Sequence, residues 1–285
     1  MGEFLFCIGK LMILLVASIR DSASVNIMRQ ILKNYPFSIS EEKFQGNSVY
    51  ISQIGGKTVK LALFNEELVY AQNIIGFFPQ TQLVIFISKH SSASGKPTLS
   101  VHTPGNLGAA ELGGISRKVS ISPANAMKVA LKTMNKLVEE ERINYEVSYE
   151  CTHHGPSLDV PAMFAELGSS PKNWGDQKAA EIVAHAVMES VQNFEVNKCD
   201  AALGIGGPHY NEKFTKIALK DEASFSHIIP KYAIPIIDDE ILRQCVERTL
   251  EKVELAFLDW KGMKSEDRQK IIKIVDGIGL NIRKV

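Results

Sequence analysis

Short apolar runs alternate with amphipathic stretches along the chain, and this alternation is typical of an α/β protein. Each apolar run has the length of a buried strand, and the runs predict strands at residues 11–17, 49–54, 59–64, 83–88, 99–102, 145–150, 163–167, 201–205 and 226–229. The two glycines at 55–56 suit a two-residue turn, so we expect a hairpin there. The pattern therefore predicts a largely parallel or mixed sheet flanked by helices.

Three stretches have apolar residues at helical spacing. In the first, we expect Ser122 to cap the helix, Pro123 to occupy its first turn, and the apolar stripe to run over residues 127–138. The second begins near Asp176, which is expected to cap it, and contains His185 as a structural or exposed residue. The third begins near Asp239, and its apolar positions are Ile241, Leu242, Cys245, Val246, Leu250 and Val253. All three stripes are interpreted as core packing.

The chain has 285 residues, which is longer than a typical single domain. We expect residues 1–11 to be an N-terminal extension, with Met12 as an alternative start. Residues 12–285 are expected to form a single α/β catalytic domain or two closely joined lobes. The apolar stretch at 4–16 is interrupted by Lys10 and is too short to span a bilayer. We therefore expect a soluble cytoplasmic protein with no membrane contact.

Composition and charge narrow the possible functions. Apolar residues make up 45% of the chain, which excludes wholesale disorder. The 32 basic and 32 acidic residues cancel, so a polyanion would have to bind a local patch. One basic stretch near the C-terminus contains Lys264, Arg268, Lys270, Lys273, Arg283 and Lys284, although a solvated helix face is the simpler interpretation. The four cysteines form no CxxC pair, which fits a reduced cytosolic protein.

Five of the seven histidines follow apolar runs, and two of them are adjacent. They are His90, His102, His153, His154 and His209. In an open α/β sheet, ligands collect at the carboxyl ends of strands, and histidine is the commonest metal ligand. The alternative is a set of separate structural histidines. We interpret the pattern as one convergent, metal-bearing site.

A catalytic zinc ion takes three protein ligands and one water. The loop that holds His153 and His154 can hardly supply all three ligands, so partners from other strand ends are expected. The spacing matches neither HExxH nor a zinc finger, and the residues alone leave the ligand set open. Glu166 is a further candidate, as a metal ligand, as a general base, or as the cap of the following helix.

Two segments could bind an anionic ligand. The segment 88–97 is rich in hydroxyl groups and contains Gly95 and two lysines, which suits a phosphate, although a flexible surface turn has the same composition. Its spacing is not that of a Walker loop. Gly206 and Gly207 follow another strand and permit close approach of the backbone to a ligand, with His209 and Tyr210 pointing inward.

Together these segments resemble the zinc-dependent D-aminoacyl-tRNA deacylases of the archaeal and plant type. The matching stretches are KHSSASGKPTLSVHTPGN (89–106), YECTHHGPSLDVPAMFAELGSSPKNW (149–174) and GIGGPHYNEKFT (204–215). The resemblance runs from about Met12 to the C-terminus. It implies hydrolysis of the ester between a D-amino acid and the terminal ribose of tRNA, with zinc required. It also implies an α/β fold similar to the nucleoside phosphorylase and peptidyl-tRNA hydrolase group.

The resemblance suggests roles for the residues already named. His153 and His154 would hold zinc together with His209 or His90, while Glu150 or Glu166 would transfer a proton and His102 would belong to the catalytic group. The expected tRNA-binding or phosphate-binding residues are Lys89, Ser94, Gly95, Lys96, Gly206, Gly207 and Tyr210, the last as a surface on which a base could stack. The C-terminal basic stretch would contact the acceptor stem. No obligate protein partner is evident, and we expect a monomer.

Three alternatives remain at this point. A zinc peptidase or amidase that acts on a small molecule needs the same ligands but no basic surface. A non-catalytic RNA- or nucleotide-binding module could use the histidines and glycine loops only to hold phosphates. In the third, the ribose hydroxyl of the tRNA attacks the ester, and the histidines are structural.

Overall fold

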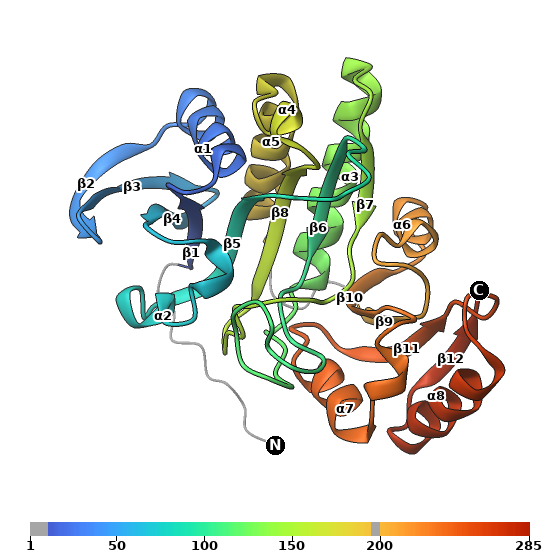
Figure 1. Cartoon of the computed structure of the whole chain (residues 1–285). Helices are drawn as coiled ribbons and strands as arrows, with labels where there is room; N and C mark the ends of the chain where they lie inside the picture. The colour runs from blue at the N-terminus through green and yellow to red at the C-terminus, as the bar shows by residue number, and fades with distance from the viewer. Residues whose placement is uncertain (1–10, 195–199) are drawn as a thin grey trace.

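The computed structural model describes residues 11–194 and 200–285, which form two β-sheets joined side by side (Figure 1). The extension expected at residues 1–11 lies outside the described residues except for its last residue. The large sheet contains, in spatial order, β2 (Ser38–Phe44), β3 (Asn47–Ile54), β4 (Lys57–Phe64), β1 (Met12–Ser18), β5 (Thr81–Lys89), β8 (Ala162–Gly168), β6 (Thr98–His102) and β7 (Glu146–Tyr149). The small sheet contains β10 (Ser224–Ile229), β9 (Ala201–Ile205), β11 (Val253–Leu258) and β12 (Asn281–Lys284).

The large sheet is mixed and the small sheet is parallel. Strands β4, β1, β5 and β8 run in one direction, whereas β6 is antiparallel to β8 and parallel to β7. Strand β3 is antiparallel to both of its neighbours and joins β4 through Gly55 and Gly56, whose φ values of 56° and 78° confirm the predicted hairpin turn. All nine predicted strands are present, and the predicted α/β class with a mixed sheet flanked by helices is confirmed.

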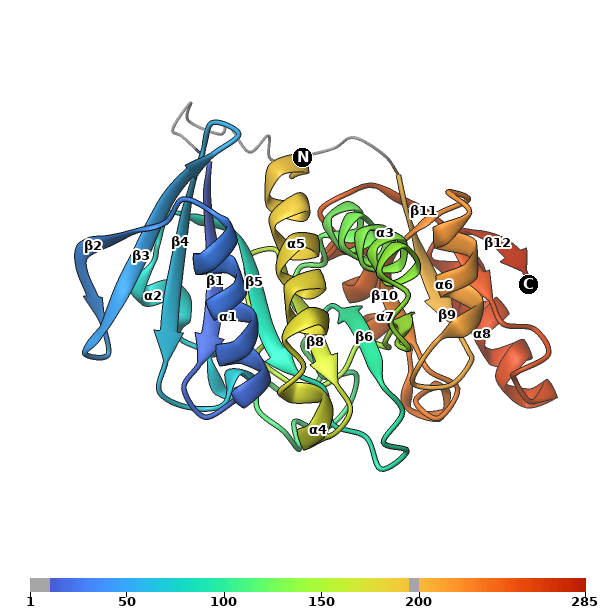
Figure 2. The ribbon, with the colours of Figure 1, turned by 90° about the horizontal axis from the view of Figure 1, so that it is seen from above.

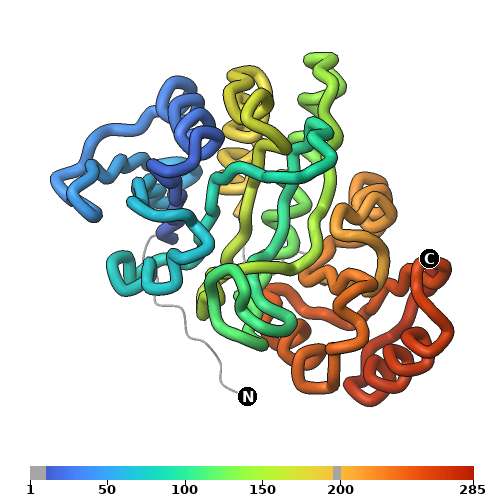
Figure 3. Tube along the Cα trace, in the orientation of Figure 1, coloured from blue at the N-terminus to red at the C-terminus, as the bar shows by residue number. Residues whose placement is uncertain are grey.

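Helices α1 (Ser22–Asn34), α3 (Ala124–Glu141) and α5 (Gln177–Asn193) cover one face of the large sheet (Figure 2). Their apolar sides pack on alternate strand residues such as Ile85, Ala165 and Val101, in a cluster that also includes Phe225 of the small sheet. The remaining helical segments are η1 (Leu68–Tyr70), α2 (Ile74–Phe77), α4 (Pro171–Trp174), α6 (Glu212–Leu219), η2 (Ile234–Ile236), α7 (Asp239–Glu247) and α8 (Ser265–Gly277). Figure 3 shows the chain passing from the large sheet into the small one.

Two details of the predicted helices are wrong. Helix α3 is not capped by Ser122, whose hydroxyl accepts a hydrogen bond from Thr103 at 2.7 Å. Instead the buried carboxylate of Glu251 accepts the N–H groups of Ala124 and Asn125 at 3.0 and 2.8 Å, which satisfies two of the donors that a helix start leaves free.

The third helix ends at Glu247 rather than at Val253. The chain turns there because Ser122 pairs with residues 248–250. The N–H of Ser122 donates to Arg248 O, and the N–H of Leu250 donates to Ser122 O. Strand β11 then begins at Val253. The predicted cap of the second helix is confirmed, since Asp176 accepts the N–H groups at 178 and 179.

Among the described residues, no helix has both the length and the apolar character needed to cross a membrane.

Candidate functional site

The site lies on the face of the large sheet opposite the three covering helices. Along β8, Ala165 and Leu167 point into the helix-covered core, so Phe164 and Glu166 point to the other face. The same alternation in β6 places His102 beside them, with its ring stacked on Phe164 at a centroid distance of 5.0 Å. The site is therefore built on a sheet face, with loops closing over it.

From the sequence we expected the histidines to meet because their strands would share one carboxyl edge of the sheet. The strands do not share such an edge. Strands β6 and β7 run opposite to β5 and β8, so His90 follows one strand at one end and His102 closes another nearer the other end. They come together because Glu166, between them on β8, lies within 3.3 Å of His90 Nδ1 and 3.8 Å of His102 Nε2.

The loop after β7 brings His153 and His154 over this face. Its backbone is held from three sides: Cys151 N–H donates to His209 O at 3.0 Å, Thr152 N–H donates to Ile228 O at 2.8 Å, and Gly105 N–H donates to His154 O at 2.7 Å. The loop therefore joins the large sheet, the segment after β9 and strand β10. Buried backbone groups that are paired in this way fix the positions of the two imidazoles.

His227, on β10, is a structural residue that the sequence analysis did not single out. Its Nε2 lies 3.1 Å from Arg248 O, and its Nδ1 lies 3.1 Å from the hydroxyl of Thr152. Because a carbonyl oxygen can only accept, Nε2 carries the proton and Nδ1 accepts from Thr152. His227 thus anchors the loop immediately before His153. A histidine within a strand that ends in two isoleucines was the available signal.

The stability of the protein is expected to fall as the pH drops from 6.5 to 4, in part through His227. Burial lowers the pKa of His227 to about 4, so in this range the unfolded chain binds a proton that the folded chain does not. The contribution of neutral His227 to the free energy of unfolding is complete above pH 6.5 and reaches on the order of 3 kcal/mol. Urea unfolding at pH 7 and 5 measures it, and His227→Gln should flatten the dependence. Identical pH dependence in both proteins would contradict this role.

Three imidazoles form the centre of the site. The rings of His102, His153 and His154 have centroid distances of 4.2–4.9 Å, and one nitrogen from each lies within 4.8 Å of the others. His153 Nδ1 and His154 Nδ1 donate to the carbonyls of Cys151 and Gly155, each at 2.8 Å. The Nε2 atom of each neutral ring therefore presents a lone pair, which is the arrangement found in metal-bound histidines.

The charge state of these rings also suits metal binding. Burial, reinforced by the neighbouring His102, lowers the pKa of His153 well below its usual value and that of His154 to about 4. Both rings are therefore neutral at pH 7. His102 is buried, and neither of its ring nitrogens has a hydrogen-bond partner among the described residues. A buried polar group without a partner is costly, and a metal ion would satisfy it.

A second group contains two buried carboxylates and an imidazole. His90 Nδ1 lies 3.1 Å from Glu150 Oε1 and 3.3 Å from Glu166 Oε2, and His90 Nε2 contacts the hydroxyl of Tyr210. Burial lowers the pKa of His90, but the two carboxylates outweigh burial and raise it to about 11. Burial likewise opposes ionisation of Glu150 and Glu166, yet the histidines around them lower both pKa values. The group is therefore ionised.

His209 completes the cluster from the loop after β9. Its Nε2 lies 2.9 Å from Glu150 Oε2, and its Nδ1 lies 3.2 Å from Cys151 Sγ and 3.3 Å from the hydroxyl of Tyr232. Burial lowers the pKa of His209, but Cys151 and Glu150 outweigh it and raise the pKa to about 10. Glu150 thus lies between two positively charged imidazoles and holds both in place.

The structure brings all five predicted histidines together but groups them differently from the expected ligand set. His153 and His154 group with His102 rather than with His90. His153 also belongs to another set of possible metal ligands, with Cys151 and His209. A protonated imidazole has no free lone pair, so His90 and His209 are poorer ligands in this charge state than His153 and His154.

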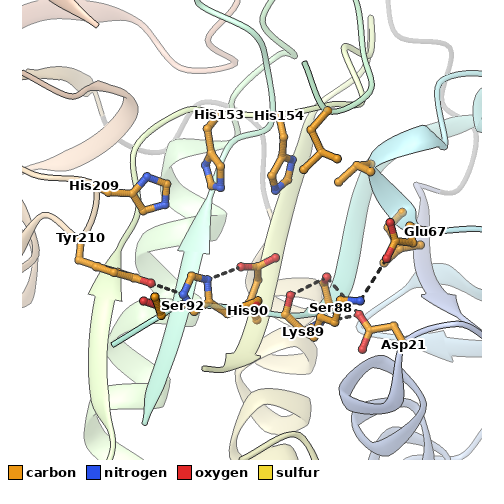
Figure 4. A pocket seen from close by; sticks show the side chains of 16 residues that line it. Asp21, Glu67, Ser88, Lys89, His90, Ser92, His153, His154, His209 and Tyr210 are labelled. Atoms are coloured by element: carbon orange, nitrogen blue, oxygen red, sulfur yellow. Dashed lines mark hydrogen bonds and ion pairs between the residues drawn. The ribbon is translucent and has the colours of Figure 1, made fainter. Parts of the chain in front are cut away.

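A cavity of about 550 Å³ opens in front of the histidines (Figure 4). Figure 4 shows His209, His153 and His154 in a row above His90, with Asp21 and Glu67 at the far side. Asp21 accepts the N–H groups of Ser24 and Lys89, at 3.0 and 2.6 Å, and the Lys89 ammonium lies 3.1 Å from Glu67. Neither Asp21 nor Glu67 was predicted; Asp21 is the N-cap of helix α1.

A second cavity, of about 390 Å³, lies on the other side of the same histidines. Leu112, His153 and His154 line both cavities. The remaining wall comes from the loop after β6 and from the segment between β10 and η2, through Gly105, Asn106, Leu107, Gly108, Ala109, Glu111, Thr152, Pro230, Tyr232, Ala233 and Ile236.

The predicted phosphate-binding residues are only partly placed at these cavities. Lys89 and Tyr210 line the first cavity, whereas Ser94, Gly95, Lys96, Gly206 and Gly207 line neither. The Lys96 ammonium pairs with Glu146 at the surface, and Gly207 O accepts the N–H of Lys231. In the C-terminal basic stretch, Lys270 donates to the carbonyls of Ile234 and Pro235, beside the second cavity.

Comparisons with known sequences agree on one family. The sequence profile described as D-aminoacyl-tRNA deacylase matches residues 77–283. A D-aminoacyl-tRNA deacylase of Pyrococcus abyssi is 40% identical over 272 residues, which cover 93% of this chain and 96% of that protein. One of Thermococcus onnurineus is 39% identical over 268 residues, 91% and 95% of the two chains. A crystal structure of a conserved protein of unknown function superposes with a TM-score of 0.85 at 27% identity, covering 97% of this chain and 95% of its own.

Proposed function

This chain belongs to the D-aminoacyl-tRNA deacylase family, and on that basis we propose that it hydrolyses the ester bond of D-aminoacyl-tRNA, releasing the free D-amino acid and tRNA. The observation that supports a hydrolytic site is the cluster of imidazoles, with His153 and His154 neutral, beside ionised carboxylates where two cavities share a wall. In this role the protein would remove D-amino acids from tRNA before they reach translation. The expected cytoplasmic location and monomeric state belong to the same proposal.

His102, His153 and His154 are the residues that would hold a zinc ion. Three imidazole donors are a common protein ligand set for catalytic zinc, and the two unpartnered ring nitrogens of His102 fit this role. Zinc held there would supply a Lewis acid that polarises the ester carbonyl and acidifies water near neutral pH. The carbonyl groups of Cys151 and Gly155 orient two of the three imidazoles.

Glu166 is the group that would transfer the proton. It is ionised, it lines the first cavity, and it lies within 3.8 Å of His102. As a general base it would accept a proton from the attacking water, and the same carboxyl group would return it to the departing ribose oxygen. Glu150 lines neither cavity and acts as a positioning residue for His90 and His209.

The function is tested with matched D-tyrosyl-tRNA and L-tyrosyl-tRNA, each with and without a chelator. We expect D-tyrosyl-tRNA to be hydrolysed at least about tenfold faster than the L form. A chelator should abolish turnover, added zinc should restore it, and rising salt should weaken it because phosphate contacts release counterions.

The alternative functions give different results in the same assay. Cleavage of small peptides or amides with no action on tRNA would indicate a small-molecule hydrolase. Binding of tRNA without turnover and without stoichiometric metal would indicate a binding module. Turnover that persists in chelator, but stops when the ribose hydroxyl is replaced, would indicate that the ribose hydroxyl of the tRNA is the nucleophile.

A further inference from the structure

Two cavities meet at one pair of histidines. The cavities of about 550 and 390 Å³ share His153, His154 and Leu112 as a common wall. A substrate whose ester lies at these imidazoles must extend in two directions, one for the acyl group and one for the alcohol. One cavity is therefore available for the acyl group and one for the alcohol. The chemistry of the two linings indicates which cavity binds which group.

The first cavity is lined by charged groups and the second mainly by apolar ones. Asp21, Glu67 and Glu166 contribute carboxylates to the first, together with the Lys89 ammonium, which pairs with Glu67, and the imidazoles of His90 and His209. Apart from the shared histidines, Glu111 is the only charged side chain that lines the second cavity within the described chain. The α-ammonium group of an amino acid is better stabilised among the carboxylates, whereas a flat nucleobase fits apolar walls with backbone polar groups nearby.

Large apolar side chains are exposed at the second cavity. Tyr232 is 61% exposed and Ile236 is 53% exposed, and both belong to its lining together with Leu112, which is 45% exposed. The hydroxyl of Tyr232 lies 3.3 Å from both Cys151 Sγ and His209 Nδ1. The ring is thus held at its hydroxyl end while much of the side chain remains accessible. An aromatic ring fixed in this way is a suitable surface for base stacking.

The geometry points to the second cavity as the subsite for the terminal adenosine of tRNA, with the adenine stacked on Tyr232 and the amino acid in the first cavity. This inference rests on the proposed function and specifies how the substrate lies. It replaces Tyr210 as the expected stacking residue, because the Tyr210 hydroxyl contacts His90 within the first cavity.

The surroundings of the second cavity fit a polyanion that leaves it. The Lys270 ammonium, from helix α8, donates to Ile234 O and Pro235 O at 3.0 and 2.8 Å, so the basic side of α8 lies against the same η2 segment that presents Ile236. The phosphates that precede the terminal adenosine would then run towards the C-terminal basic stretch.

The test compares a substrate that has the base with one that lacks it. In Tyr232→Ala, we expect kcat/KM for D-tyrosyl-tRNA to fall about tenfold more than kcat/KM for D-tyrosine ethyl ester, mainly through KM, because base stacking is lost. Tyr232→Phe keeps the ring and should restore most of that difference. Adenosine alone, followed by NMR titration of the purified full-length protein, should bind about tenfold more weakly to Tyr232→Ala.

Three outcomes would overturn the inference. Equal losses on the two substrates would mean that Tyr232 acts through His209 or Cys151 rather than on a base. Unchanged adenosine binding in Tyr232→Ala would place the base elsewhere. A Phe variant as impaired as the Ala variant would assign the effect to the hydroxyl group. If the wild-type protein hydrolyses neither substrate, the proposed function fails, and adenosine binding alone decides the subsite.

Discussion

Replacement of His153 by alanine is expected to remove zinc from the purified protein and to lower kcat/KM for D-aminoacyl-tRNA by about a thousandfold or more. Among the described residues there are three possible three-donor groups, and His153 belongs to two of them, with His102 and His154 and with Cys151 and His209, whereas the third is His90 with Glu150 and Glu166. Loss of His153 therefore weakens either of its two arrangements, whichever of them holds the ion. Metal content by mass spectrometry and steady-state kinetics measure the two effects.

A matched histidine outside the site provides the control. His185 lies on helix α5, where its Nδ1 contacts the hydroxyl of Tyr35 at 2.8 Å. His185→Ala should keep its metal and most of its activity. His102→Ala then separates the two donor groups, since it disrupts only the one that contains His154. If His153→Ala retained stoichiometric zinc and wild-type turnover in chelated buffer, the zinc assignment would be refuted.

Glu150→Gln is expected to lower the free energy of unfolding of the metal-free protein by about 3–5 kcal/mol. Glu150 is buried and lies within 3.1 Å of both His90 and His209; together with Glu166 it raises the pKa of His90, and together with Cys151 it raises the pKa of His209. A neutral amide removes the carboxylate partner of His209 and one of the two carboxylates beside His90, which keeps only Glu166. Urea unfolding at pH 7 measures the difference.

An exposed carboxylate gives the comparison for this prediction. Glu212 pairs with Lys216 one helical turn away at 3.4 Å, with both side chains largely exposed. Glu212→Gln should change the unfolding free energy by less than about 1 kcal/mol, because exposed ion pairs contribute little. A Glu150→Gln protein as stable as this control would show that the buried charges are not mutually dependent.

Most of the apolar strands were predictable from the sequence. Strand β1 is buried along its whole length, and its sequence is a continuous apolar run. Strand β2 was missed because Ser38–Phe44 is an edge strand whose residues are mostly polar and exposed. Strand β11 was missed because Val253 continues the helical spacing of the preceding residues. Only the pairing of residues 248–250 with Ser122, which is distant in sequence, ends that helix.

The membership of the site was more predictable than its internal arrangement. The position of histidines after apolar runs was sufficient to select His102, His153 and His209. The direction of β6 relative to β8 is a tertiary property that no local pattern encodes, so the grouping of His102 with His153 and His154 could not be derived. The second cavity could not be predicted either, because its lining comes from segments far apart in the sequence, such as Leu107 after β6 and Tyr232 after β10.

The three backbone contacts that hold the loop at Cys151–His154 have a consequence for how activity arises during folding. Two of them come from residues beyond position 205, on the small sheet or the segment that follows β9. A nascent chain that has completed only the large sheet would carry His102, His153 and His154 without the framework that orients them. If these histidines are the catalytic residues proposed above, catalytic competence would be acquired late, when the C-terminal third docks, and loosening of that docking would abolish activity before the protein unfolds.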